Sequence, residues 1–300
     1  MNIRDLQYVI AIAEEKHFGR AAERCHVSQP ALSGQIRKLE DYLGVTLFER
    51  TNRSVKITPI GEQITSQARQ LLTIADEIVL AAQAAKDPLS GPFRLGMIAT
   101  IAPSLSPLIL SIIRQKLPKL SLTLVEGFTE NLEKAVTNGE LDGAILATAP
   151  EYTHLRESLL YDEPFWVALP KGHALAKNKA IDVCDLPHEE LLLLADGHCL
   201  RNQVLDICSA NTVTANANTR ETSLGTLLAL VAAGDGITLV PALSKPTKMT
   251  NIITLREATQ TALRTVRLVF RKSFPRTAII ESLADIIRKS MPDNLVRVIS

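Results

Sequence analysis

The chain has 300 residues, of which 46% are hydrophobic, and a formal net charge of +1, values typical of a globular protein of about two domains. In the sequence, no apolar run approaches the roughly 18 residues of a membrane span. Acidic residues interrupt the N-terminus at Asp5, Glu14 and Glu15, where a signal peptide needs an apolar stretch. We therefore expect a cytoplasmic protein without a membrane partner, in a compartment too reducing for a structural disulfide.

Three helices are predicted at the N-terminus, over 4–15, over Gly19–Cys25, and from Ser28 to Gly44. Ser28 can cap the third helix, and Pro30 suits its first turn, where a missing N–H costs no helical hydrogen bond. Two short helices joined by a tight turn, the second with a polar face, are typical of a helix-turn-helix. That polar face is expected to comprise Gln29, Ser33, Gln35, Arg37 and Lys38.

A small hairpin is predicted next, with strands over Leu47–Arg50 and Val55–Ile57. It would form a wing that carries Arg50 and Arg53, well placed for phosphate or minor-groove contacts on double-stranded DNA. Side-chain amides and hydroxyls can read base edges in the major groove. We expect the following residues to face that groove: Gln29, Pro30, Ser33 and Arg37.

A local positive charge supports DNA binding. Between Lys16 and Thr58 there are eight Lys/Arg and four acidic residues, an excess that the near-neutral whole chain conceals. Attraction to phosphate is local, so this excess matters more than the overall charge. A merely solvated face is the alternative, and the helix-turn-helix pattern favours DNA.

One long amphipathic helix of about seven turns is predicted from Pro59 to Ala85. Its apolar stripe needs a partner, and a second copy of the same helix is the simplest one. We therefore expect a homodimer. The segment Asp87–Pro92, with two prolines and a glycine, is the expected hinge.

Short apolar strands alternate with helices over residues 93–300, a pattern typical of parallel α/β sheets. The expected strands are 93–99, 120–126, 144–147, 165–170, 191–195, 213–215, 236–240 and 265–270. The expected helices are 104–117, 130–138, 200–208, 222–233 and 276–290. Ligands in such sheets bind at the carboxyl ends of strands. Thr100 and Thr129 directly follow two strands, so we expect both hydroxyls to point into a cleft, with helix N-caps as the alternative.

Two cysteines, Cys199 and Cys208, lie close together in the sequence, and His198 and Arg201 flank the first. Cations near a thiol favour the thiolate, the form that oxidants attack, and a second thiol can capture the product as a disulfide. The pair could therefore be a redox trigger. The alternative is two buried thiols that act as small hydrophobic residues.

Helical spacing makes the redox hypothesis more specific. If 200–208 is helical, nine steps separate the Cα atoms of Cys199 and Cys208 by roughly 13 Å. A disulfide requires Cα atoms within about 7 Å. Oxidation must then unwind part of the segment. Cys25 and Cys184 are isolated and are expected to be core or incidental thiols, and no Cys/His cluster has metal-site spacing, so no metal or other cofactor is expected.

Several motifs resemble those of LysR-type transcriptional regulators. In the N-terminal region they are Phe18–Ala22, Ser28–Ser33 and Leu47–Arg50, and near the C-terminus Gly236–Pro241. The segment Asp196–Arg201, with Cys208 and the stretch from Thr222 to Gly234, resembles the peroxide-sensing members of that family. One departure is Asn202, where those sensors commonly have an acid, which puts the tuning of the thiol in doubt.

The resemblance implies an α/β architecture with an N-terminal winged helix-turn-helix, a long linker helix and a periplasmic-binding-protein-like regulatory domain of two subdomains. The implied boundaries are 1–58 for the DNA-binding domain, 59–90 for the linker and dimerisation helix with its hinge, and 91–300 for the regulatory domain. Within it, subdomain I would cover about 91–161 and 268–300, and subdomain II about 162–267.

The resemblance also implies a function. Hydrogen peroxide would oxidise Cys199 to a sulfenate that Cys208 resolves as a disulfide. The implied peroxide or thiolate environment comprises Thr100, Thr129, His198 and Arg264. The protein would be an activator of oxidative-stress genes and no enzyme. Its implied partners are promoter DNA, RNA polymerase, further copies of the chain in a dimer and tetramer, and a glutaredoxin- or thioredoxin-type reductant for reset.

Two alternatives remain open at this point. A LysR-type regulator could instead respond to a small metabolite bound in the cleft between the subdomains. An enzyme or solute-binding protein is a different class, which the sequence disfavours because it has no nucleophile motif and no GxGxxG, and because the 1–58 region would then have no role.

Overall fold

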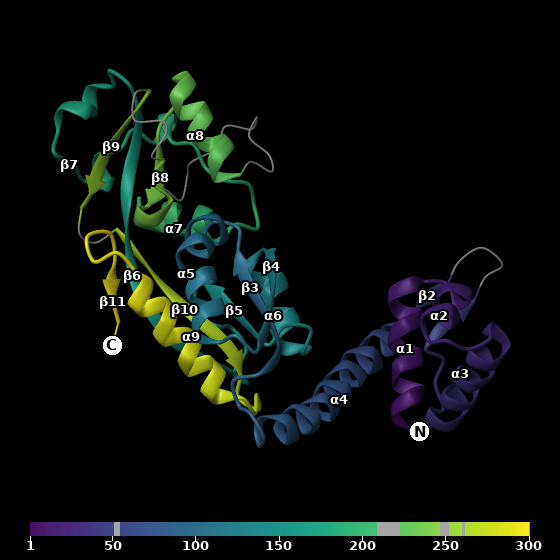
Figure 1. The fold of residues 1–300 in the computed structure, drawn as a ribbon. Helices are drawn as coiled ribbons and strands as arrows, with labels where there is room; N and C mark the ends of the chain where they lie inside the picture. Colours follow the sequence, from purple (N-terminus) through teal and green to yellow (C-terminus); the bar gives the residue numbers. More distant parts are fainter. Residues whose placement is uncertain (51–54, 209–222, 247–251, 260–261, 300) are drawn as a thin grey trace. The chain divides into compact units, whose positions relative to one another are not determined.

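The structure is a computed structural model that describes residues 1–50, 55–208, 223–246, 252–259 and 262–299 (Figure 1). The expected strand at 213–215 and the wing residue Arg53 lie outside the described residues. The chain divides into two compact units: one is Met1–Lys86 with Thr137–Gly139, the other Asp87–Val136 with Glu140–Ser300. Among the described helices, none is long and apolar enough to cross a membrane.

The first unit begins with three helices around one apolar core, α1 (Ile3–Glu15), α2 (Phe18–Arg24) and α3 (Gln29–Leu43). The predicted ends of α3 are confirmed. The Ser28 hydroxyl accepts a hydrogen bond from the Ala31 N–H at 3.3 Å, and Gly44 ends the helix with a left-handed φ of 69°. The predicted hairpin is also present, as the antiparallel strands β1 (Phe48–Arg50) and β2 (Val55–Ile57).

The predicted long helix is α4 (Pro59–Ala84), with 26 residues. Ala68, on the face of α4 that packs against α1, is only 2% exposed. Several large apolar side chains of α4 remain exposed in the single chain, which is what an unpaired association face would show. They are Leu71, Ile74, Ile78 and Val79.

The second unit is built on a large sheet in which the strand order is β4-β3-β5-β10-β6-β9-β7, with β8 and β11 also paired to β6. The strands are β3 (Gly91–Ile98), β4 (Leu120–Gly127), β5 (Gly143–Leu146), β6 (Leu155–Pro170), β7 (Ala180–Ile181), β8 (Thr238–Pro241), β9 (Ile253–Ala258), β10 (Leu263–Arg271) and β11 (Arg297–Val298). Figure 1 shows the long β6 running from the part that holds β3, β4 and β5 to the part that holds β8 and β9.

The sheet is mixed, whereas the alternation of strands and helices predicted parallel sheets. The pairs β3–β4 and β3–β5 are parallel, but β10 runs antiparallel to both β5 and β6. The reason is that β10 pairs along its whole length with the first part of the long β6, which continues to β8 and β9. Alternation of strands and helices along the sequence cannot reveal such a return strand.

The helices of this unit follow the predicted pattern within a few residues. They are α5 (Ala102–Lys116), α6 (Thr129–Thr137), α7 (Cys199–Ile207), α8 (Leu224–Ala233) and α9 (Thr277–Ser290), with short 3-10 helices η1 (Ala174–Lys177), η2 (Val183–Asp185), η3 (His188–Glu190) and η4 (Ala242–Ser244).

The expected strand over 191–195 is wrong. Leu191 makes only an isolated parallel bridge to Ile237, and no ladder continues from it. The run Leu191–Leu194 is nevertheless buried in the core of the second unit. Its apolar composition therefore reflects burial, which a short run of leucines cannot distinguish from a strand.

Candidate functional site

Both cysteines of the predicted pair lie on α7. Cys199 is the first residue of this helix and Cys208 follows its last, with the Cys208 N–H donating to the Val204 carbonyl at 3.0 Å. Both thiols are free. The predicted helix is thus confirmed, and its rise sets the two Cα atoms roughly 13 Å apart, too far for a disulfide in this conformation.

The two thiols have different environments. Cys208 is 2% exposed and packs in the core of the second unit with Leu200 and Val204. Burial in this apolar environment raises the pKa of the Cys208 thiol to about 11. Cys199 is half-buried and lies at the N-terminal end of α7, where unpaired helix N–H groups favour negative charge. The asymmetry suits an attacking thiol at Cys199 and a reserve thiol at Cys208.

The cations predicted beside Cys199 act differently from the expectation. Burial lowers the pKa of His198, so its ring is neutral near pH 7, and it packs edge-on against Phe128 with centroids 4.8 Å apart. Arg201 pairs with Asp196 at 3.0 Å and donates to the Leu194 carbonyl at 3.2 Å. Its charge is therefore balanced by Asp196, and it holds the turn before α7 in place.

Cys199 lines a cavity of about 470 Å³. Only some of the residues that line it were expected from the sequence. Thr129 and His198, both expected near the thiol, line it together with Asn202. The Thr129 hydroxyl is buried and has no hydrogen-bond partner among the described residues. A buried hydroxyl without a partner is uncommon and is available to a small polar ligand.

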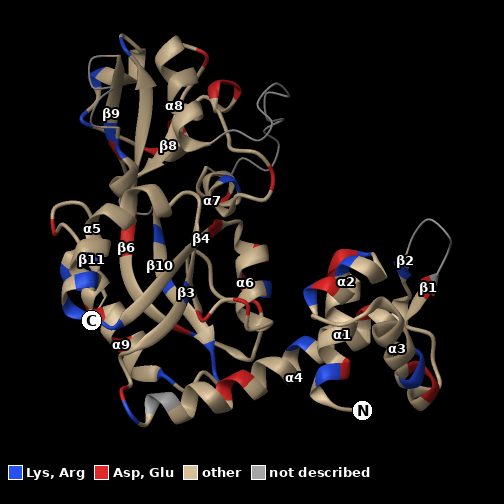
Figure 2. Ribbon diagram, turned by 45° about the vertical axis from the view of Figure 1, so that its right-hand side comes forward, with Lys and Arg blue, Asp and Glu red and all other residues tan. Residues whose placement is uncertain are grey.

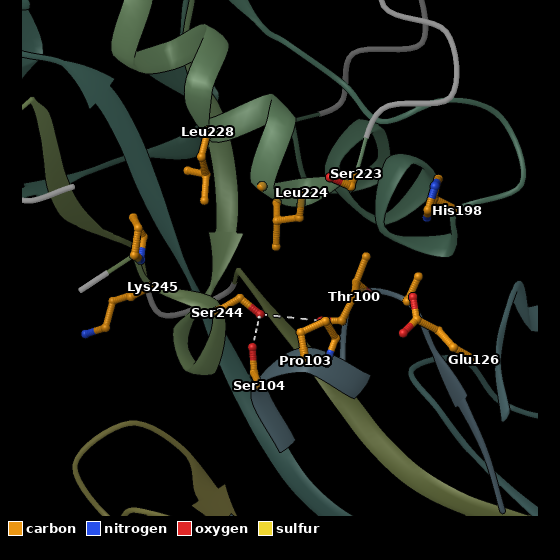
Figure 3. Close-up of a pocket in the computed structure, with 13 residues that line it drawn as sticks. Thr100, Pro103, Ser104, Glu126, His198, Ser223, Leu224, Leu228, Ser244 and Lys245 are labelled. Carbon is orange, nitrogen blue, oxygen red and sulfur yellow. Dashed lines mark hydrogen bonds between the residues drawn. The ribbon is translucent and has the colours of Figure 1, made fainter. Parts of the chain in front are cut away.

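Thr100 and Arg264 form a second group, away from the lining of the Cys199 cavity. The Thr100 hydroxyl accepts from Arg264 Nη1 at 3.1 Å, and Ser244 Oγ donates to the Thr100 carbonyl at 3.4 Å (Figure 3). Thr100 lines another cavity, of about 670 Å³, which shares His198 with the first. Arg264 lines neither cavity, because it is buried in an ion pair with Glu163. Ile101, and not Thr100, occupies the N-cap of α5.

The lining of the Cys199 cavity includes a buried carboxyl that the sequence did not single out. Glu133 lies on α6, is 3% exposed and lines the same cavity. The signal that could have identified it is its spacing, because Thr129 and Glu133 are four residues apart and so share one face of the helix.

The residues expected to face the major groove lie on α3. Gln29, Ser33 and Arg37 follow one another at four-residue steps and so share one face of α3, whereas Leu32 and Ile36 are buried, and Figure 2 shows basic residues on this helix. Gln29, Pro30 and Arg37 are exposed, and Ser33 is half-buried.

Two details of the basic region differ from the expectation. Gln35 does not belong to the polar face, since its amide donates to Asp5 Oδ1 at 2.8 Å inside the unit. Arg20 and Arg24 pair with Glu15 and Glu14, which reduces the free positive charge of the region. Arg50 lies on β1.

Comparison with known proteins gives the family. The model described as "Bacterial regulatory helix-turn-helix protein, lysR family" matches residues 3–62, and "LysR substrate binding domain" matches 86–292. The "DNA-binding transcriptional dual regulator OxyR" of Escherichia coli (strain K12) is 42% identical over 301 residues, covering 100% of this chain and 99% of the relative.

Solved structures agree. Full-length OxyR from Pseudomonas aeruginosa, solved as a variant, has a TM-score of 0.80 at 40% identity, over 96% of this chain and 95% of that chain. A hydrogen-peroxide-bound OxyR mutant from Corynebacterium glutamicum has a TM-score of 0.66 at 35% identity, over 96% and 92%. A helix-turn-helix unit followed by an α/β substrate-binding-type unit defines a bacterial regulatory protein. The chain belongs to the LysR family, in its OxyR branch.

Proposed function

We propose that this protein is a transcription regulator that binds double-stranded promoter DNA and senses hydrogen peroxide by oxidation of Cys199. The observation that carries the proposal is the arrangement around α7. The half-buried Cys199 at the start of the helix lines a cavity together with Thr129, whose hydroxyl has no partner among the described residues. The buried Cys208 lies at the end of the same helix. The protein is in this proposal no enzyme, and it works in the cytoplasm.

The proposed chemistry has two steps. The Cys199 thiolate attacks one peroxide oxygen, an S–O bond forms, the O–O bond breaks, and the second oxygen leaves as water after taking a proton. The Cys208 thiol then attacks the sulfenic acid sulfur, and a disulfide forms with release of a second water. Because the helical separation of roughly 13 Å exceeds the reach of a disulfide, α7 unwinds and Cys208 leaves the core in this step.

The surrounding residues have separate proposed roles. Thr129 hydrogen-bonds the peroxide through its free hydroxyl, and His198 does so as a neutral ring. Thr100 and Arg264 are hydrogen-bonded to each other. Their proposed role is to keep the segment after β3 in position and to stabilise, from a distance, the negative charge that develops on the leaving oxygen. Refolding of α7 repacks the surface of the regulatory unit and so changes the spacing of the DNA-binding units in an oligomer.

We propose the domain boundaries implied by the family: 1–58 for DNA binding, 59–90 for the linker, and 91–300 for regulation, with subdomains 91–161 plus 268–300 and 162–267. Copies of the chain would pair through α4 as a homodimer that assembles into a tetramer. The oxidised form would activate oxidative-stress genes by contact with RNA polymerase, and a glutaredoxin- or thioredoxin-type reductant would restore the thiols. In DNA binding, α3 would read the major groove, and Arg50 and Arg53 would contact the backbone or minor groove.

The test combines peptide mapping with DNA footprinting after one equivalent of peroxide. A crosslink between Cys199 and Cys208 is expected, together with a changed footprint. Cys208→Ser should abolish both, and Cys184→Ser is the matched control that should leave both intact. If Cys208→Ser keeps the oxidised footprint and promoter activation, the disulfide switch is wrong.

A second candidate function rests on the cavity of about 670 Å³, which is large enough for a metabolite and is lined by Leu224, Leu228 and Pro103. A regulator of this kind would respond to a small molecule bound there. Thermal stabilisation of the protein by an aromatic acid or amino acid, without any response to peroxide, would favour this candidate.

A further inference from the structure

The cavity of Cys199 contains a buried carboxyl group for which the proposed sensing chemistry has so far no use. Glu133 is 3% exposed, and one of its oxygens, Oε1, is buried without a hydrogen-bond partner among the described residues. Its other oxygen, Oε2, accepts from the Glu151 N–H at 3.3 Å. A buried carboxyl with one unpartnered oxygen lowers the stability of the folded protein. The single backbone contact does not explain why the fold retains it.

The position of Glu133 on α6 supplies an explanation. Glu133 and Thr129 are one helical turn apart on the same face and both line the cavity that Cys199 also lines, and each has a buried oxygen without a partner among the described residues. The cavity therefore combines a thiol, a hydroxyl and a carboxyl. Oxidation of a thiol by peroxide needs one proton to leave the sulfur and one to reach the departing oxygen.

We propose that Glu133 is the proton-relay residue of this site, an inference that rests on the proposed peroxide-sensing function. The Glu133 carboxylate takes the proton of the Cys199 thiol, directly or through a bound water. The thiolate then attacks the peroxide, the S–O bond forms and the O–O bond breaks. The leaving oxygen takes the same proton back from the Glu133 carboxyl and departs as water. The net change is thiol plus peroxide to sulfenic acid plus water, and Glu133 ends as it began.

The electrostatics of the cavity agree with this role. Burial raises the pKa of Glu133 by more than the hydrogen bond from the Glu151 N–H lowers it, and the Glu151 charge adds a smaller rise, so the carboxyl holds a proton more readily than an exposed one. The other titratable groups that line the cavity are Glu130, Glu151, Tyr152, His198 and Cys199. Of these, Glu130 is paired with Lys134, and burial lowers the pKa of His198, so its ring carries a single N–H near pH 7.

The test measures the rate constant for Cys199 sulfenic acid formation, with peroxide added to the full-length protein in a Cys208→Ser background. Trapping with dimedone and mass spectrometry gives the rate. Glu133→Gln keeps the shape and the acceptor for the Glu151 N–H but cannot carry the proton. The rate constant is expected to fall by about 100-fold, the lower end of the contribution of general acid–base catalysis. Glu157→Gln, a carboxyl of β6 outside the lining of this cavity, is the control and should react at the unchanged rate.

Two further readouts separate proton transfer from a structural effect. With Glu133 present, the rate should rise as the carboxyl ionises and fall again when the shared proton is lost at alkaline pH, a profile that belongs to the coupled pair. In Glu133→Gln the alkaline fall should disappear, and added acetate buffer should restore part of the rate. An unchanged rate and profile, or an equal loss at every pH without rescue by acetate, overturns the relay. If the protein with Glu133 intact does not react with peroxide at all, it is the proposed function that fails.

Discussion

Arg264 of β10 and Glu163 of β6 lie opposite each other in the antiparallel register, and their side chains form an ion pair of 2.8 Å with each only 1% exposed. The pair is further tied down on both sides. Glu163 accepts from the Leu243 N–H at 2.7 Å, and Arg264 donates to the Thr100 hydroxyl at 3.1 Å. One buried charge pair thus connects the two long strands with the segments that follow β3 and β8.

Removing one partner of this pair should be costly. Glu163→Gln leaves the buried Arg264 charge uncompensated, and we expect the free energy of unfolding to fall by about 3–5 kcal/mol. Urea denaturation measures it. The control is Glu157→Gln, which breaks the more exposed pair that β6 and β10 also form, between Glu157 and Arg267 at 2.9 Å. That change should cost less than about 1 kcal/mol. Equal losses would show that burial of the Arg264 pair is irrelevant to stability.

The buried Cys208 thiol should make stability depend on alkaline pH. Its pKa is raised from an ordinary 9.0 to about 11, so the folded protein holds the thiol proton more tightly than the unfolded chain does. The stabilisation is complete below about pH 9 and is lost as the pH rises through about 11, with an amplitude of about 2–3 kcal/mol. Urea midpoints at pH 8 and pH 10.5 measure the loss. Cys208→Ala should show a smaller alkaline loss, and an identical loss in both proteins would contradict this assignment.

Much of the helical framework was predictable from local signals. Ser28 begins α3 and Gly44 ends it as expected, because both act on the backbone of their own helix. The helical spacing between Cys199 and Cys208 was predictable for the same reason. Each of these features depends on residues within a few turns of one helix, so the sequence alone was enough to predict it.

Features made by distant segments were not predictable. The return of β10 beside β6 depends on pairing across about a hundred residues, and the burial of Leu191–Leu194 depends on what packs over them. The same holds at the site. Arg201 flanks Cys199 in sequence, yet its charge is used by Asp196, whereas Glu133 lies far from the thiol in sequence and lines its cavity.

Oxidation should unwind α7. Before peroxide, the amides of residues 203–207 are protected by helical hydrogen bonds, and these must break for the disulfide to close. We expect hydrogen exchange over 200–207 to accelerate at least tenfold after one equivalent of peroxide, while exchange in α9 stays unchanged. Cys208→Ser, treated identically, should keep its protection because the sulfenic acid alone imposes no closure. Persistent protection in the disulfide-bonded protein would mean that another segment moves instead.

The α3 face and the wing should contribute to DNA binding in different ways. Gln29→Ala removes an amide from the exposed α3 face, and we expect a loss of about 1–3 kcal/mol on an operator selected from random-sequence DNA, with little change on non-specific DNA. Lys56→Ala, at an exposed position of β2, should weaken binding to both DNAs. It should also reduce the slope of log K against log salt concentration by about one. Fluorescence anisotropy across a salt series distinguishes them. If Gln29→Ala weakens binding to both DNAs equally, Gln29 does not contact bases specifically.

The exposed face of α4 should control association of the chain. Ile74 and Ile78 are 58% and 68% exposed in the single chain and lie one turn apart on one face of the helix. In a two-fold dimer each contact occurs twice, and burial of one isoleucine contributes about 2 kcal/mol. Ile78→Ser should therefore weaken dimerisation by more than about a hundredfold.

Sedimentation equilibrium measures that shift, and Asp76→Ser, at an exposed position on another face of the same helix, is the control that should associate normally. Circular dichroism checks that both variants keep their helices. If Ile78→Ser remains dimeric at the concentrations where the unmodified chain does, the association surface lies in the regulatory unit. The exposed Leu124, Val125 and Phe128 on and after β4 are then the next surface to substitute.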